Sequence, residues 1–244
     1  MHKNFVMVDG LDGSGKGVIV NALRKWAEEK NLNILDLKDF CDENKRLPKP
    51  NEITDYDAII SCEMTNCWIG SALREEIVRN NKRDYSILST AQAFALDREI
   101  LYKRVLIPAL KQGKYVFQKR GVISSIVYQP LQGSIALSEI MKMPGNRLAI
   151  QNAPGLLLIA VVAPETVMYR LKQREKQDSA IFEEINFQRK LEQRYNSQWL
   201  KNLFENHGSK VIYIDTNFPK TTEDTEKETL KIWADFTEDK FKEL

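Results

Sequence analysis

The sequence predicts an α/β protein in which a parallel sheet carries helices on both faces. Short apolar runs typical of buried strands alternate with longer stretches of helical periodicity along all 244 residues. The first apolar run, 5–8, is followed by the glycine-rich segment Gly10-Leu-Asp-Gly-Ser-Gly-Lys-Gly17 and then by a helical pattern. No repeat, low-complexity tract or long linker interrupts the chain, so we expect one domain over 1–244.

The first half of the chain is expected to supply three strands, at 5–8, 33–37 and 58–62. Apolar residues recur at helical spacing from Val18 to Trp26, which predicts a helix over 16–30. The segment 39–57 is polar and contains two prolines, so we expect a loop or an insertion there. Further helices are predicted over 69–79 and 89–112, the second with a kink at Pro108.

The second half continues the alternation. Pro164 should open a helix directly after the most apolar run of the chain, because proline is favoured in a helix's first turn. We predict strands at 115–118, 156–162 and 210–214, and helices at 124–131, 135–141, from 164, at 182–206 and at 225–236.

Composition restricts the classes of protein that fit. Lys and Arg total 36 against 34 for Asp and Glu, so a net charge of +2 argues against a protein that coats nucleic acid. No stretch approaches the roughly 20 apolar residues of a spanning helix, and the N-terminus lacks a signal-peptide pattern. The odd count of three cysteines favours reduced thiols and a cytoplasmic protein. Cys62 and Cys67 could hold a metal ion, but no second cysteine pair or nearby histidine completes such a site.

The glycine-rich segment is the strongest chemical signal. Its glycines, Gly10, Gly13, Gly15 and Gly17, allow the backbone N–H groups to turn inward around a phosphate. The helix that follows adds the partial positive charge of its N-terminus, and Lys16 adds a full charge. Strand, spacing and helix together predict a P-loop NTPase fold. The triphosphate-binding residues are then expected to be Gly10, Gly13, Ser14, Gly15, Lys16, Gly17 and Val18.

Two helical segments carry weaker signals. Phe94 and Arg98 are four residues apart and share a helix face, where a ring can stack on a base and a guanidinium can bond its carbonyl group. A core phenylalanine beside a surface arginine is the more common explanation of that spacing. The basic run at Arg170, Arg174 and Lys176 could form a lid over the phosphates near 172–184, although such runs usually belong to solvated helices.

A third segment, from Lys119 to Gln129, follows a predicted central strand. Loops at the carboxyl ends of parallel strands build the ligand crevice, so Lys119 and Arg120 could bind a second phosphate. A solvated charge pair at a strand end is an equally good explanation.

Together these segments resemble the thymidylate kinase family. The phosphate loop looks like the family's Glu/Asp-Gly-x-Asp/Glu-Gly-x-Gly-Lys start, and Phe94 to Arg98 looks like its Phe-x-x-Asp-Arg helix. Ser124, Ser125, Tyr128 and Gln129 match the end of its Asp-Arg-Tyr-x-x-Ser-Ser-x-x-Tyr-Gln motif, and Pro164-Glu165 matches its Asp-Pro-Glu helix start.

The resemblance implies roles for the matching positions. Asp12 would accept from the 3′-hydroxyl of the sugar, Phe94 would stack on thymine with Arg98 at its carbonyl edge, Arg120 would hold the monophosphate, and Tyr128 would favour deoxyribose. It also implies ATP and Mg²⁺ as cofactors, dTMP as the favoured acceptor, and a cytoplasmic homodimer without nucleic-acid or membrane partners. We expect the catalytic residues to be Lys16, Arg120, Asp12 and Asp9. We expect the acceptor site to comprise Asp12, Arg74, Phe94, Arg98, Arg120, Ser124, Tyr128 and Gln129. Mg²⁺ would be held mainly by phosphates and water, with Asp9 as its protein ligand.

Several positions depart from the family pattern. Gly17 replaces the hydroxyl residue of the usual phosphate-loop motif, Cys62 replaces a phosphate-binding arginine and Lys119 replaces an acid. Gly121 stands where the family has tyrosine, and Ser179 where it has a lid arginine. These departures leave open a protein that binds nucleotide with weakened turnover, or a kinase for another nucleoside monophosphate.

Overall fold

A six-stranded parallel sheet forms the centre of the protein. The computed structural model describes residues 2–79, 81–133, 135–173 and 185–242. The strands lie in the order β2-β3-β4-β1-β5-β6, so β1, which leads into the glycine-rich loop, is central. Their bounds are β1 His2–Gly10, β2 Ile34–Asp36, β3 Ala58–Cys62, β4 Tyr115–Lys119, β5 Pro154–Val161 and β6 Lys210–Asp215.

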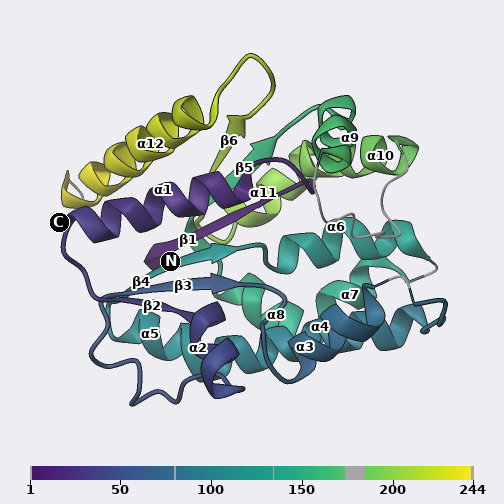
Figure 1. Ribbon diagram of the computed structural model, residues 1–244, viewed down its shortest axis with the longest axis horizontal. Coiled ribbons are helices and arrows are strands. Elements are labelled where there is room, and N and C mark those ends of the chain that lie inside the picture. The colour runs from purple at the N-terminus through teal and green to yellow at the C-terminus, as the bar shows by residue number, and fades with distance from the viewer. Residues whose placement is uncertain (1, 80, 134, 174–184, 243–244) are drawn as a thin grey trace.

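Helices cover both faces of this sheet (Figure 1). Helices α1 and α12 pack together on one face, and the helices of the middle of the chain cover the other. The helices are α1 Lys16–Glu29, α2 Leu37–Asn44, α3 Ile69–Ala72, α4 Ile87–Leu101, α5 Ile107–Lys111, α6 Val122–Gln132, α7 Leu137–Lys142, α8 Pro144–Gln151, α9 Pro164–Lys172, α10 Ile185–Tyr195, α11 Gln198–Glu205 and α12 Thr222–Lys242. Two π-helical turns, η1 Leu73–Ile77 and η2 Tyr102–Leu106, extend α3 and α4. No helix of the described residues is both long and apolar enough to cross a membrane.

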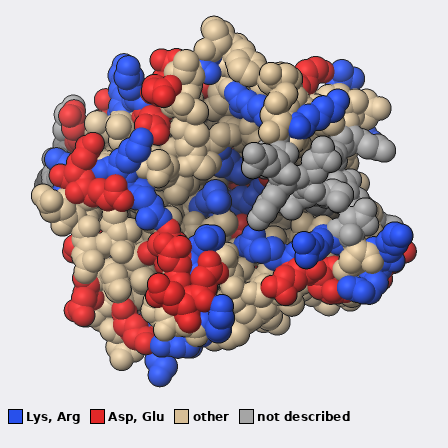
Figure 2. All heavy atoms as spheres, viewed as in Figure 1, with Lys and Arg blue, Asp and Glu red and all other residues tan. Residues whose placement is uncertain are grey.

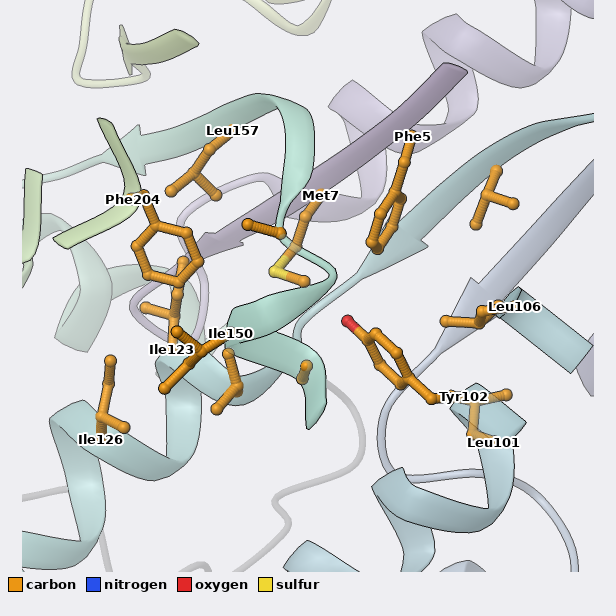
Figure 3. Close-up of a cluster of buried hydrophobic side chains, with 14 of the residues drawn as sticks. Phe5, Met7, Leu101, Tyr102, Leu106, Ile123, Ile126, Ile150, Leu157 and Phe204 are labelled. Atoms are coloured by element: carbon orange, nitrogen blue, oxygen red, sulfur yellow. The ribbon is translucent and has the colours of Figure 1, made fainter. Parts of the chain in front are cut away.

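The alternating side chains of β1 divide the core into two parts. Phe5 and Met7 point into the larger part, where Figure 3 shows them beside Tyr102, Leu157 and other fully buried side chains. Val6 and Val8 point to the opposite face, into the cluster formed with α1 and α12. A strand buried on both faces has no polar side to expose, which is why residues 5–8 are all apolar.

Three local predictions differ from the structure. Residues 37–44, expected to be mostly loop, form α2, because Asp36 caps its N-terminus and Leu37 and Cys41 bury one face. The long helix expected over 182–206 is divided into α10 and α11, since Ser197 caps a new helix. Helix α8 was not predicted at all. The wider turn η2 ends at Leu106, two residues before Pro108, a disturbance expected near a residue that lacks an N–H group.

Candidate active site

The phosphate loop leaves the carboxyl end of β1 and leads directly into α1. Gly10, Gly13 and Gly15 have φ angles of 143°, 77° and 81°, a backbone region that residues with a side chain rarely adopt. At Gly10 a Cβ atom would lie only 2.5 Å from the carbonyl oxygen of Ala160 on the neighbouring strand. Gly10, Gly13 and Gly15 are therefore required by the loop's shape, whereas Gly17 lies in α1 with open space around it. Lys16 begins this helix.

Lys16 is buried within this loop. Its Nζ donates to the carbonyl oxygens of Gly10 at 2.9 Å and Leu11 at 2.5 Å. Burial, reinforced by the positive charge of Arg120, lowers the pKa of Lys16 to about 7. An anion placed beside this amine would restore the charged form.

This electrostatic situation makes a prediction about proton uptake. A bound triphosphate should raise the pKa of Lys16 again, so the amine must gain a proton wherever it is neutral beforehand. We expect ATP binding to take up about nine-tenths of a proton at Lys16 at pH 8 and about one-tenth at pH 6. Calorimetry in buffers of different ionisation enthalpy measures this difference. The Lys16→Arg variant keeps the positive charge but does not titrate in this range, so the difference in proton uptake between pH 6 and pH 8 should disappear. Equal proton uptake at both pH values in the unchanged protein would contradict the assignment.

Asp9 lies at the end of β1 and is fully buried. Its two carboxylate oxygens accept hydrogen bonds from the backbone N–H groups of Gly10 at 2.8 Å and Gly121 at 3.2 Å, and from the hydroxyls of Ser124 at 3.0 Å and Tyr195 at 2.9 Å. Asp9, one of the predicted catalytic residues, therefore links the phosphate loop, the start of α6 and the end of α10. Tyr195 was missed by the sequence analysis, because nothing in the charged pattern of α10 distinguishes it from an ordinary core tyrosine.

Arg120 and Asp12 form an ion pair across the mouth of the phosphate loop. Arg120 follows β4 with a φ of 64°, and its guanidinium also lies 3.3 Å from the hydroxyl of Ser124. The ring of Tyr128 is buried beside that of Tyr195, with centroids 6.4 Å apart. The structure thus brings together Lys16, Asp12, Arg120 and Tyr128, to which the resemblance assigns the two phosphate groups and the sugar.

Arg98 is placed in a closed polar network and is only 1% exposed. Its Nε donates to Glu63 at 2.8 Å, and its Nη2 lies 2.6 Å from the same carboxylate. Other donors reach Asn146, the hydroxyl of Ser125 and the carbonyl oxygen of Gly121. The arginine expected at a base carbonyl is therefore bound to a buried glutamate in this structure.

Two features build that network. Helix α8 approaches α4 so closely that a Cβ atom at Gly145 would overlap the carbonyl oxygen of Ala95, and this approach brings Asn146 to Arg98. Glu63 follows β3 directly, and its other oxygen accepts from Gln118 of β4 at 2.9 Å. Its position at the carboxyl edge of the sheet was a signal available in the sequence.

The remaining predicted acceptor residues vary in exposure. Phe94 is half-buried on α4, and Gln129 is buried on α6 with its amide nitrogen 3.3 Å from Ser125. Arg74 is exposed and donates to the carbonyl oxygen of Met64 at 2.6 Å. Arg74 thus binds the backbone before α3, near enough to Asp97 for its charge to oppose the burial that raises the pKa of that carboxyl.

Of the predicted lid residues, the structure places only Arg170. Its guanidinium donates to the carbonyl oxygens of Gly13 at 3.2 Å and Thr216 at 2.5 Å, beside the exposed ring of Phe218. Arg174 and Lys176 lie outside the described residues, as does Ser179. Arg170 therefore belongs to the outer wall of the phosphate loop.

Cys62 and Lys119 are paired in register at the ends of β3 and β4. The two departures from the family pattern therefore lie side by side. Lys119 on β4 places a positive charge next to the position on β3 where the family has an arginine and this chain has Cys62. Lys119 is also near enough to Lys16 to help lower its pKa, although burial and Arg120 contribute more. Figure 2 shows Lys and Arg atoms on the floor of a hollow in this face of the molecule, an arrangement that favours anions.

The described acidic residues of this site do not form a metal-binding cluster. No cluster of three or more His, Cys, Asp or Glu side chains that could hold an ion occurs in the part of the chain that the structure describes. Asp9 already accepts several hydrogen bonds, and Asp12 is paired with Arg120. The prediction that Asp9 ligates Mg²⁺ therefore lacks support from this geometry.

Comparisons with known proteins agree with the resemblance drawn from the motifs. The model of the thymidylate kinase family matches residues 50–228. A thymidylate kinase of Caldicellulosiruptor saccharolyticus is 27% identical over 191 residues, covering 78% of this chain and 80% of that protein. A probable thymidylate kinase of Pyrococcus abyssi is 28% identical over 198 residues, covering 80% and 82%. The crystal structure of thymidylate kinase from Ehrlichia chaffeensis has a TM-score of 0.58 at 18% identity, covers 94% of this chain and 97% of that chain, and confirms the predicted fold class.

Proposed function

Because the chain belongs to the thymidylate kinase family, we propose that it transfers the γ-phosphate of ATP to a deoxynucleoside monophosphate, dTMP first, to give dTDP. One observation carries the proposal: the phosphate loop and Arg120 meet at the carboxyl edge of the sheet, so two phosphorylated ligands can face each other there.

The donor side is the phosphate loop. Its backbone N–H groups and the N-terminus of α1 would hold the β- and γ-phosphates, and Lys16 would follow the transferred group with its charge. Arg170 and the exposed ring of Phe218 lie at the outer end of the loop, a suitable place for the rest of the nucleotide. The loop's N–H groups are held in place by the fold, so they need no rearrangement when charge develops.

The acceptor side is formed by Asp12, Arg120, Tyr128 and Phe94. Arg120 would exchange its contact with Asp12 for the acceptor phosphate, and Asp12 would accept from a sugar hydroxyl. Transfer would be direct and in line, because the acceptor phosphate oxygen is itself the nucleophile and no covalent intermediate is required. We propose that Mg²⁺ arrives as part of the nucleotide, held by phosphates and water, since magnesium commonly retains several waters.

We also propose that the enzyme is a cytoplasmic homodimer without nucleic-acid or membrane partners. Its cysteines are free thiols, which suits a reducing compartment. Leu88 and Leu96 on α4 are 52% and 48% exposed and stand eight residues apart, so both lie on one face of the helix. That face would supply apolar area to a second copy.

Assay of nucleoside monophosphates with radiolabelled ATP tests the proposed function. We expect diphosphate product with dTMP in excess of that with dUMP, dCMP, dGMP or AMP. The second candidate is a nucleotide-binding protein with little turnover, favoured by the replacement of a phosphate-binding arginine by Cys62 and of an acid by Lys119. Tight ATP binding by calorimetry with no diphosphate from any acceptor would establish that alternative and refute the kinase proposal.

A further inference from the structure

Two buried thiols lie in contact beside the acceptor side of the site. The sulfur atoms of Cys41, on α2, and Cys67, just before α3, are 3.0 Å apart, and the residues are 1% and 3% exposed. They are 26 positions apart in the sequence, so the fold alone brings them together. Neither takes part in the mechanism proposed above.

The two thiols differ in acidity. The two sulfur atoms share a hydrogen bond in which either thiol could be the donor, and this contact lowers the pKa of Cys67 while it raises that of Cys41. Cys67 is therefore the thiol that ionises first. A thiolate is the nucleophilic form of cysteine, so Cys67 would react first with an oxidant.

A small hollow reaches Cys41, whose sulfur lies 3.0 Å from that of Cys67; Cys67 itself does not line the hollow. The hollow offers about 10 Å³ of space to a water-sized molecule and is lined by Cys41, Thr65, Asn66 and the half-buried Cys62. Its rim includes Lys38, whose side chain is exposed.

We propose that Cys41 and Cys67 are a redox modification site at which a hydroperoxide forms a disulfide. The Cys67 thiolate attacks one peroxide oxygen, breaks the O–O bond and becomes a sulfenic acid, while the other oxygen leaves with a proton as water. The Cys41 sulfur then attacks the sulfenic sulfur, forms the S–S bond and displaces a second water. Two thiols lose two electrons and two protons, and one peroxide becomes two waters.

The bridge would act on the segment that holds the acceptor network. Thr65 donates its backbone N–H to Asp97 at 2.9 Å, and its hydroxyl lies 2.6 Å from that carboxylate and 3.0 Å from the carbonyl oxygen of Cys67. In the same segment, Glu63 binds Arg98. A Cys41–Cys67 disulfide would therefore fix residues 63–67 to α2 and restrict the backbone beside Asp97 and Arg98.

Thiol counting and peptide mapping test the site directly. The full-length protein, reduced and then exposed to stoichiometric hydrogen peroxide, should fall from three titratable thiols to one, with a Cys41–Cys67 cross-link in the mass spectrum. The matched control Cys62→Ser should fall from two to none. Cys41→Ala and Cys67→Ala should each keep Cys62 reduced and form no cross-link. Three persisting thiols, or a bridge that includes Cys62, would overturn the proposal.

Stability and kinetics test the consequence. The disulfide closes a loop within the chain, so we expect the oxidised protein to melt about 5 °C or more above the reduced one. The Cys62→Ser variant should show the same rise in melting temperature on oxidation. The kinetic expectation rests on the proposed function: KM for the monophosphate should change at least about threefold on oxidation, with KM for ATP unchanged. Equal changes for both substrates would refute the coupling to the acceptor side. The thiol count and melting temperature need no turnover, so failure of the kinase proposal would be distinguished from failure of the redox site.

Discussion

Replacement of Lys16 by alanine is expected to lower kcat by a factor of about 100 to 1,000, equivalent to about 3–4 kcal/mol. The amine is the basic group built into the phosphate loop, and phosphoryl transfer depends on positioning and on charge stabilisation. The change should also weaken ATP binding. It should leave the fold intact, since burial of this ammonium opposes folding, as its lowered pKa indicates.

Initial rates at saturating dTMP, with circular dichroism and a melting curve, measure this effect. Lys111→Ala is the matched control, because Lys111 is exposed on α5, far along the chain from the loop, and its loss should change neither rate nor stability. A Lys16→Ala protein that is folded and turns over at the original rate would refute the phosphate-loop assignment.

Glu63→Gln is expected to lower the free energy of unfolding by about 3–5 kcal/mol, because it leaves the Arg98 guanidinium buried without its counter-charge. The side chains of the pair are only 2% and 6% exposed, so water cannot replace the lost carboxylate. For a protein of this size the melting temperature should fall by about 6–20 °C. Glutamine keeps the shape of the side chain, so the loss reports charge and hydrogen bonding.

Denaturant titration of three variants separates the causes. Removal of both charges in Glu63→Gln with Arg98→Met should recover part of the loss, since a neutral pair no longer leaves an isolated buried charge. Glu52→Gln is the control: Glu52 pairs with Arg46, but those side chains are 32% and 33% exposed, and we expect little change. A loss at Glu63 no larger than at Glu52 would show that Arg98 is not held as a buried ion pair.

Local patterns in the sequence determined much of the fold and the donor side. The apolar run 5–8 predicts a strand, and it is apolar because both faces of that strand are buried. The glycines from Gly10 to Gly15 are required by backbone geometry within one loop. Such features depend on neighbours a few positions away. Local strand and helix patterns alternate along the whole chain, and this alternation predicted the fold class, which the structural match confirms.

Hydrophobic and charge periodicity failed to predict two helix boundaries correctly. Helix α2 forms because Leu37 and Cys41 have a buried surface to cover, and that surface exists only once the sheet and α4 are assembled. The break between α10 and α11 is fixed by a single cap at Ser197, which the charged pattern across 182–206 does not indicate. Packing overrides propensity at α2, whereas a capping hydrogen bond sets the boundary at Ser197.

The sequence by itself determined that this protein has a phosphate loop, a parallel sheet and candidate acceptor residues at its edge. Only the tertiary structure decided what those residues contact: Asp9 meets Tyr195 from 186 positions away, and Arg98 meets Glu63. The reason is physical. A buried charge or thiol must find its partner among the groups that the sheet order brings near, and sheet order is a property of the whole chain.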